Sequence, residues 1–463
     1  MDAFRRVDRG TAGPMRDKTH LRGPGAPESS QPLHLTMQTF TPIHLAAKPS
    51  KDRLLEEYRG KSLHAVRTPA MVIDKAIFAN NCGKMHARAK EWGADFRAHL
   101  KTHKTVEGTR LQMQSNVDKT GAVIVSTVME AWEVVEAGLF ADGTVNDLLY
   151  GVPVATNKIA DLSALREKIS TSGGSLRLII DHLEQVRALE AHQKAHGVTP
   201  PWSVFVKCDG GQKRAGVPPD SPAMKALIEA SLTSTAVEIY GFYAHAGNAY
   251  GSTSRPGAES FLSSEVEVVN KAAEVALSIR ASLQVKREWP RFKLSVGSTP
   301  TAHAASAESR AKLNSLLNGD LELHAGNYPM LDLQQKHTTL VKDEDIAQWV
   351  LATVISYYPG RGAGGKDEAM VDAGAIAFSK DTGPSGGYGD VKGKNWRLDR
   401  ISQEHGTLVA GDGAGPVKIG EVLEIVGQHA CLIAAAYPWY YIVDSQDSDG
   451  QTIVDVWVPW KGW

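Results

Sequence analysis

Residues 122–151 read AVIVSTVMEAWEVVEAGLFADGTVNDLLYG and contain one complete strand–helix–strand unit. The β-rich runs AVIVST at 122–127 and DLLYG at 147–151 predict two strands. Between them, VMEAWEVVEAGL at 128–139 carries apolar residues at helical spacing, which predicts an amphipathic helix. Two strands joined by a crossover helix are typical of a parallel α/β fold.

The same alternation of strand and helix extends through residues 96–326. Eight β-rich runs lie at 96–101, 122–127, 147–151, 175–181, 202–209, 237–245, 292–297 and 321–326. Eight strand–helix units are what a (β/α)8 TIM barrel requires. On pattern alone, an open doubly wound sheet is the alternative architecture.

The sequence pattern changes beyond Asp332, where short β runs are split by Gly, Pro and Asp turns and convincing helical stretches are lacking. These runs are WVLATVISYY (349–358), AMVDAG (369–374), EVLEIV (421–426), ACLIAA (430–435), YYIVD (440–444) and IVDVWV (453–458). They predict a C-terminal β-domain. An early strand, AMVID at 70–74, exceeds the barrel count and is a candidate member of that domain. We therefore expect a barrel at 75–335 and a β-domain built from 39–74 plus 336–463.

Composition excludes several classes of protein. The 463 residues carry 51 Lys and Arg against 52 Asp and Glu, without the basic stripe of a nucleic-acid-binding protein. No apolar run reaches the roughly 18 residues of a membrane span. Three cysteines without a CxxC pair suit a reducing compartment. Residues 1–38 are rich in Gly, Pro and charge and lack the apolar core of a signal peptide, so we expect a disordered tail on a cytoplasmic protein.

The segment FRAHLKTHKT at 96–105 contains a candidate catalytic lysine. Side chains alternate along a strand, so Arg97, His99 and Lys101 share one face. Lys101 comes at the C-terminal end of the strand, where barrel enzymes place their chemistry. A partly desolvated lysine there can form an imine with a carbonyl. The same pattern also suits a half-exposed strand whose charges are solvated.

A small-residue turn offers a candidate phosphate site. In SVGSTPTA at 295–302, the backbone N–H groups of Gly297, Ser298 and Thr299 can converge on a phosphate at the start of a helix. The turn follows the seventh predicted barrel strand, a frequent phosphate site in such barrels. Turns of this kind are common, so the segment alone is a weak signal.

Two further strand ends carry polar and aromatic residues. In GFYAHAGNAY at 241–250, Tyr243 and Tyr250 can contact a cofactor, although ordinary packing explains them equally well. In KCDGGQKRAG at 207–216, Arg214 belongs either to an ion-pair cluster with Lys207 and Asp209 or to a clamp on a cofactor. We assign Arg214 to the cofactor.

In the β-domain, GQHACLIAA at 427–435 places His429 and Cys431 two residues apart. In a strand both side chains would point to one side, roughly 7 Å apart at the Cα atoms. An imidazole and a thiolate at that reach can share one zinc ion with open positions, as a catalytic site requires. A buried histidine beside a small apolar cysteine is the commoner explanation of an isolated HxC pair.

Ten segments, taken in order, resemble the eukaryotic-type D-serine dehydratase family, close kin of D-threonine aldolase. The segments are RAHLKTHK (97–104), STVMEAWEVVEAGLFADGTVNDLLYGVPV (126–154), KCDGGQKRAG (207–216), GFYAHAGNAYG (241–251), SVGSTPTA (295–302), LHAGNYPMLDLQQ (323–335), DAGAIAFSKD (372–381), SQEHG (402–406), GQHACLIAAAYPWYYIVD (427–444) and VPWKGW (458–463). The match runs from about Thr68 to the last residue.

The resemblance implies the alanine racemase-like fold, a pyridoxal 5′-phosphate (PLP) barrel followed by a β-domain, in a homodimer. It also implies that the strand before the barrel pairs with the β-domain. Residue by residue, it makes Lys101 the Schiff-base lysine, Tyr243 and Tyr250 cofactor contacts, Gly297, Ser298 and Thr299 the phosphate loop, and His429 and Cys431 the zinc ligands.

The implied reaction is the PLP- and zinc-dependent β-elimination of D-serine to pyruvate and ammonia. Lys101 would also be the base at Cα. Zinc would activate the β-hydroxyl, because free hydroxide is a poor leaving group.

Other functions stay open on the sequence. The nearest alternatives are a D-threonine or D-3-hydroxyaspartate aldolase and a 3-hydroxyaspartate dehydratase; a non-catalytic PLP-binding protein is a third. The family's more usual GHSY is replaced by GNAY at 247–250, which leaves substrate preference open. Glu404 and His405 are either active-site residues or part of a solvated loop.

Overall fold

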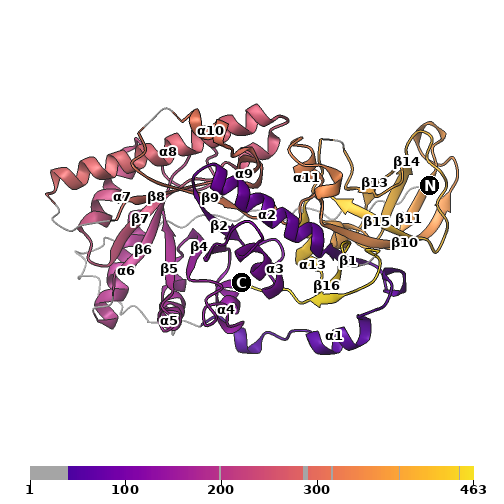
Figure 1. The fold of residues 1–463 in the computed structure, drawn as a ribbon, viewed down its shortest axis with the longest axis horizontal. Helices are drawn as coiled ribbons and strands as arrows, with labels where there is room; N and C mark the ends of the chain where they lie inside the picture. The colour runs from indigo at the N-terminus through magenta and orange to yellow at the C-terminus, as the bar shows by residue number, and fades with distance from the viewer. Residues whose placement is uncertain (1–39, 198–199, 285–289, 314–315, 385, 448) are drawn as a thin grey trace, which may run out of the picture. The chain divides into compact units, whose positions relative to one another are not determined.

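Eight parallel strands close into a barrel in the computed structural model (Figure 1). The structure describes residues 40–197, 200–284, 290–313, 316–384, 386–447 and 449–463. The barrel strands are β2 (Asp95–His99), β3 (Ala122–Val125), β4 (Asp147–Pro153), β5 (Ser175–Ile180), β6 (Trp202–Lys207), β7 (Val237–Tyr243), β8 (Phe292–Val296) and β9 (Gly319–Ala325). β9 pairs with β2 and completes the ring. All eight predicted runs are barrel strands, so the barrel is confirmed and the open sheet is excluded.

The barrel strands are buried on both faces because helices surround the barrel and side chains fill its interior. In β3, Ile124 belongs to the apolar cluster inside the barrel, whereas Val123 and Val125 belong to the larger core that includes the helices. Thr127 begins the following helix, α4 (Val128–Glu136), by accepting a hydrogen bond from the N–H of Glu130. The unit at 122–151 thus folds as its sequence predicts.

Of the other helices of the barrel region, α2 (Lys75–Glu91) precedes the first barrel strand, and the rest lie between successive strands. They are α3 (Val106–Met113), α5 (Ile159–Ser170), α6 (Leu183–His196), α7 (Pro222–Thr233), α8 (Arg255–Ser282), α9 (Thr299–Ala304) and α10 (Ala307–Ala311). A short helix, α1 (Lys51–Tyr58), precedes them. No helix among the described residues is long and apolar enough to cross a membrane.

A nine-stranded, mostly antiparallel sheet forms the second region (Figure 1). Its strands are β1 (Ala70–Asp74), β10 (Gln348–Tyr358), β11 (Glu368–Val371), β12 (Gly389–Val391), β13 (Trp396–Ile401), β14 (Gly406–Ala410), β15 (Val422–Gly427), β16 (Tyr440–Val443) and β17 (Asp455–Trp457). β1 pairs antiparallel with β10 and parallel with β16. The expectation that AMVID pairs with the β-domain is therefore confirmed.

The structure corrects the prediction for the β-domain in one important place. Residues 430–435, expected as a strand, lie in the helix α13 (Ala430–Ala436). The preceding strand ends at Gly427, and the run ACLIAAA contains four alanines, the residue with the highest helix propensity. Two more short helices, α11 (Leu333–Lys336) and α12 (Ala375–Phe378), were not predicted, nor were strands β12, β13 and β14. The predicted tail at 1–38 lies outside the described residues.

Candidate active site

A cavity of about 380 Å³ opens at the C-terminal ends of the barrel strands. Six of the nine predicted site residues line it: Lys101, Arg214, Tyr243, Tyr250, Ser298 and Thr299. The structure therefore brings together side chains from four separate segments of the chain. Gly297, His429 and Cys431 are not among the lining residues and are described below.

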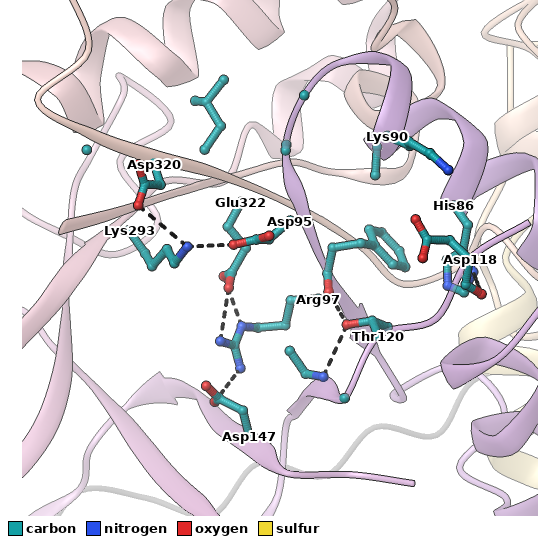
Figure 2. A pocket seen from close by; sticks show the side chains of 18 of the residues that line it. His86, Lys90, Asp95, Arg97, Asp118, Thr120, Asp147, Lys293, Asp320 and Glu322 are labelled. Atoms are coloured by element: carbon teal, nitrogen blue, oxygen red, sulfur yellow. Dashed lines mark hydrogen bonds and ion pairs between the residues drawn. The ribbon is translucent and has the colours of Figure 1, made fainter. Parts of the chain in front are cut away.

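A larger cavity of about 1040 Å³ lies at the opposite end of the barrel, where the strands begin (Figure 2). Its central charges are paired with one another. Arg97 binds Glu322 and Asp147, while Lys293 lies 2.5 Å from a carboxylate oxygen of Asp95. Because its groups are neutralised in this way and barrel enzymes react at the other end, we place the active site in the smaller cavity.

Lys101 follows β2 and faces the smaller cavity. Gly326, which also lines the cavity, lies opposite: a Cβ built there would stand 3.3 Å from Cε of Lys101. His99 lies on the same side, and burial together with the charge of Lys101 holds its pKa well below the usual range. His99 is therefore a neutral neighbour of Lys101 at this wall of the cavity.

Aromatic rings and a second lysine form the adjoining wall. The Tyr243 ring stacks on the His324 ring, with centroids 4.2 Å apart and planes 8° apart. The ammonium group of Lys207 lies 4.2 Å from the centroid of the Tyr243 ring. Burial and the nearby Arg214 lower the pKa of Lys207 to about 7. This lysine is therefore poised to change charge near neutral pH.

The predicted phosphate loop connects β8 to α9. Gly297 has a φ of +141°, and a Cβ there would lie 2.1 Å from the carbonyl oxygen of His324, so only glycine fits. Its N–H donates to Glu265, 3.3 Å away, and the N–H of Ser298 donates to the Thr301 hydroxyl, 2.8 Å away. Two of the three N–H groups expected to meet a phosphate are therefore bonded within the protein, that of Gly297 to Glu265 and that of Ser298 in the capping box of α9.

Tyr250 and Thr299 meet at the end of the same loop. Burial raises the pKa of the Tyr250 hydroxyl, and the neighbouring Thr299 partly opposes that shift. The side chains of Ser298 and Thr299 both reach the cavity. The hydroxyl groups at this end of the cavity could donate hydrogen bonds to an anion.

His429 and Cys431 meet although they do not share a strand. His429 caps α13 and Cys431 lies in its first turn. The His429 ring nitrogen Nδ1 lies 2.6 Å from a carboxylate oxygen of Asp381, and its side chain is hydrogen-bonded to that of Cys431. Burial lowers the pKa of His429, but the hydrogen bond and charge of Cys431 outweigh this effect and raise the pKa to about 9. Burial raises the pKa of Cys431, but His429 and Lys101 outweigh this effect, so that the pKa is lowered.

The pair lies beside the lysine of the barrel. The Thr102 hydroxyl oxygen is 3.1 Å from Sγ of Cys431, and Thr102 follows Lys101 directly. The Tyr440 hydroxyl lies within hydrogen-bonding distance of the His103 and Ala434 carbonyl oxygens. Tyr440 therefore connects the barrel loop to α13. The His429–Cys431 pair therefore lies next to the loop that carries Lys101.

The sequence did not single out Thr102, Asp381, Glu265 or His324. Thr102, Asp381 and His324 lie inside three of the quoted segments, LKTHK, DAGAIAFSKD and LHAGNY, so a signal was present. Glu265 lies within the long helix α8, and nothing in its sequence context marks it. Glu404 and His405 are exposed in the turn between β13 and β14, and neither lines the cavity.

Comparison with known proteins identifies the family. The model described as "Alanine racemase, N-terminal domain" matches residues 73–311, and that described as "Putative serine dehydratase domain" matches residues 347–443. The D-serine dehydratase of Schizosaccharomyces pombe is 44% identical over 420 residues, covering 89% of this chain and 96% of the relative. That of Saccharomyces cerevisiae is 33% identical over 444 residues, covering 89% and 99%.

A solved structure gives the same result. D-threo-3-hydroxyaspartate dehydratase from a Delftia species superposes with a TM-score of 0.71 at 29% identity, covering 87% of this chain and all of the other. A cysteine-to-alanine variant of D-threo-3-hydroxyaspartate dehydratase, described as metal-free, matches with a TM-score of 0.72 at 30% identity, again over 87% of this chain and all of that one. With its closed barrel, its β-sheet and these relatives, the chain belongs to the D-serine dehydratase family of PLP-dependent lyases, which share the alanine racemase-like fold.

Proposed function

We propose that the protein converts D-serine to pyruvate and ammonia by β-elimination. The observation that carries this proposal is the contact of 3.1 Å between Thr102 and Cys431. It joins the cavity that contains Lys101 to the histidine–cysteine pair of α13. A reaction that needs a base at Cα and an acid at the β-hydroxyl can therefore find both in one place.

The cavity suits PLP in size and in chemistry. Its volume of about 380 Å³ falls within the range of small-molecule sites, and it contains a lysine amine, two tyrosines and hydroxyl groups. Lys101 would hold the cofactor covalently, and the other contacts would come from Arg214, Tyr243, Tyr250, Ser298 and Thr299, on the loop turned by Gly297. When bound, PLP supplies an electron sink that makes the Cα proton of an attached amino acid removable.

Lys101 would then act as the base. Its Nζ, no longer held by the cofactor once a substrate is attached, could accept the Cα proton. Elimination requires one base, on one face of the substrate, whereas racemisation requires a second base on the opposite face. One lysine beside an acid for the hydroxyl therefore supports elimination.

The His429–Cys431 pair suits zinc, which prefers imidazole nitrogen and thiolate sulfur. Nδ1 of His429 is engaged by Asp381, so Nε2 is the nitrogen left for a metal, the usual arrangement of a histidine ligand. No group of three or more potential ligands gathers among the described residues, so two protein ligands would leave positions open for water and substrate. Zinc there would act as a Lewis acid on the β-hydroxyl.

A second candidate is dehydration or aldol cleavage of a 3-hydroxy-D-amino acid such as 3-hydroxyaspartate. One feature of the cavity favours this second candidate, because Arg214, and Lys207 when protonated, could hold a second carboxylate. The same lysine and the same metal pair would serve either reaction.

The deciding experiment measures the 2-oxo acid released from each substrate, with and without a strong chelator: pyruvate from D-serine or L-serine, 2-oxobutyrate from D-threonine and oxaloacetate from D-3-hydroxyaspartate. Pyruvate from D-serine that is lost on chelation and restored by zinc supports the proposal. Glycine and an aldehyde from D-threonine, without pyruvate from D-serine, would show that the enzyme is an aldolase. Cofactor binding without turnover of any D-amino acid would identify a non-catalytic PLP-binding protein.

Two variants separate the roles. Cys431→Ala is expected to retain PLP absorbance and lose elimination, whereas Cys82→Ala, at a buried cysteine in α2, keeps both. We also propose that the protein is a homodimer. Light scattering on the purified protein, with a mass twice that of the 50.0 kDa chain, would support this assembly.

A further inference from the structure

A line of buried polar groups runs inside the barrel from the cavity of Lys101 toward the opposite end. His324 and Glu322 lie on β9 two residues apart, so both side chains point inward. Ser295 of β8 is in register with Glu322 and lies between the two. All three side chains are almost completely buried. Polar groups at such depth require partners.

The partners form a continuous chain of hydrogen bonds. Nδ1 of His324 lies 3.1 Å from the Ser295 hydroxyl oxygen, which lies 2.8 Å from Oε1 of Glu322. Arg97 donates from Nε to Oε1 and from Nη2 to Oε2 of Glu322, at 2.9 and 3.0 Å. Its third bond, 2.7 Å long, goes to Asp147 (Figure 2). The chain therefore starts at the cavity wall and ends in a paired guanidinium.

The direction of the bonds follows from what each group can donate. The carboxylate of Glu322 only accepts, so the single proton of the Ser295 hydroxyl must point toward it. The Ser295 oxygen can then only accept from His324, which places a proton on Nδ1. Arg97 supports this direction because it donates two hydrogen bonds to the same carboxylate.

The direction of these bonds determines the state of the other ring nitrogen of His324, Nε2. Nε2 of His324 is buried and has no hydrogen-bond partner among the described residues, and the ring lines the cavity. Burial and the charges of His245 and Lys207 hold the pKa of His324 well below its usual range, so the ring is neutral. A neutral ring with its proton on Nδ1 presents a bare lone pair at Nε2.

We propose that Ser295 and Glu322 are positioning residues that hold His324 as a hydrogen-bond acceptor at the wall of the active-site cavity. This chain of hydrogen bonds is formed by residues of the protein alone, but the role proposed for it in the active site rests on the proposed function. An acceptor of this kind suits a proton-bearing atom of whatever occupies the cavity. On the PLP ring that atom is the ring nitrogen, and keeping its proton preserves the electron-withdrawing power of the ring.

Neutron diffraction from deuterated crystals of the holoenzyme directly tests the direction of these hydrogen bonds. We expect deuterium on Nδ1 of His324 and a Ser295 hydroxyl directed at Glu322. Deuterium on Nε2 with a bare Nδ1 overturns the proposal. This measurement needs no activity, so it remains decisive even if the protein fails to turn over D-serine.

A matched pair of variants tests the consequence. Ser295→Ala removes the acceptor of the Nδ1 proton, whereas Ser231→Ala removes an equally buried hydroxyl that bonds only a backbone carbonyl in α7. Titration of each apoprotein with PLP should show roughly tenfold weaker binding for Ser295→Ala alone, the worth of one hydrogen bond to a charged group, and a shifted cofactor absorbance band. Equal affinities and spectra for the two variants overturn the proposal.

Discussion

The hydroxyl oxygen of Thr102 lies 3.1 Å from the sulfur of Cys431, although 329 residues separate them in sequence. Thr102 is fixed by the barrel loop after β2, and Cys431 is fixed by the first turn of α13. Each of these residues is adjacent to a group with a proposed chemical role, Lys101 on one side and His429 on the other. The contact thus fixes how far the proposed base lies from the proposed metal ligands.

Thr102→Val should lower kcat for D-serine about fivefold and leave KM nearly unchanged. Valine keeps the shape of threonine but loses the hydroxyl, and a hydrogen bond of this kind contributes about 1 kcal/mol. Steady-state kinetics of pyruvate release measure the effect. Thr109→Val is the control, since Thr109 is also buried and its hydroxyl bonds only the backbone of Thr105. If the two variants behave alike, the contact does not position the site.

Asp381→Asn should weaken zinc binding by about 10- to 100-fold. The carboxylate of Asp381 orients His429 through Nδ1, and losing a partner of that kind typically costs this much metal affinity. Competition with a chromophoric chelator gives the zinc dissociation constant without using activity. Asp142→Asn removes a surface carboxylate paired with Arg110 and should leave zinc affinity unchanged. An unaltered constant for Asp381→Asn would remove Asp381 from the metal site.

Gly297→Ala should abolish PLP binding or destabilise the fold by at least about 3 kcal/mol. The new Cβ would lie 2.1 Å from a backbone oxygen, and the φ of +141° is unfavourable for any residue with a side chain. Urea denaturation and PLP titration measure the two effects. Gly251→Ala is the control because a Cβ there meets nothing within 4 Å and its φ is not positive. A fully stable Gly297→Ala protein that binds PLP normally would contradict the expectation.

The barrel could be predicted from sequence because its information is local. Each strand is a short β-rich run, and helices such as α4 show a buried apolar stripe after a threonine cap. The β-domain was harder to predict. The strand pattern around residue 430 conflicted with the helix propensity of four alanines in ACLIAAA, and propensity prevailed once the strand ended at Gly427.

The candidate site could be predicted only as far as single segments allow. Lys101 and the loop at 297–299 follow barrel strands, so their arrival at one cavity follows from the fold. Asp381 lies 48 residues from His429, and nothing local pairs them. Ser295 looked like an ordinary strand residue, because its role depends on the register between β8 and β9.

Glu265 is a buried carboxylate behind the loop of Gly297. Its Oε1 accepts hydrogen bonds from the N–H groups of Ala246, at 2.5 Å, and Gly297, at 3.3 Å. Burial dominates over these bonds and raises its pKa from 4.5 to about 7. In the folded protein this group therefore binds a proton over a pH range in which the unfolded chain has already released it.

The free energy of unfolding should consequently fall as pH rises from about 4.5 to about 7. Over that range the folded state binds more protons than the unfolded state, so this group stabilises the fold fully below pH 4.5, and the stabilisation is lost as pH passes through 7. A pKa difference of this size corresponds to about 3 kcal/mol. Glu265→Gln, which keeps an acceptor for Ala246 but cannot ionise, should remove that part of the pH dependence. Urea denaturation at pH 5, 6, 7 and 8 measures it, with Glu267→Gln on the same helix as control. Parallel stability–pH curves for wild type and Glu265→Gln would show that Glu265 is ionised throughout.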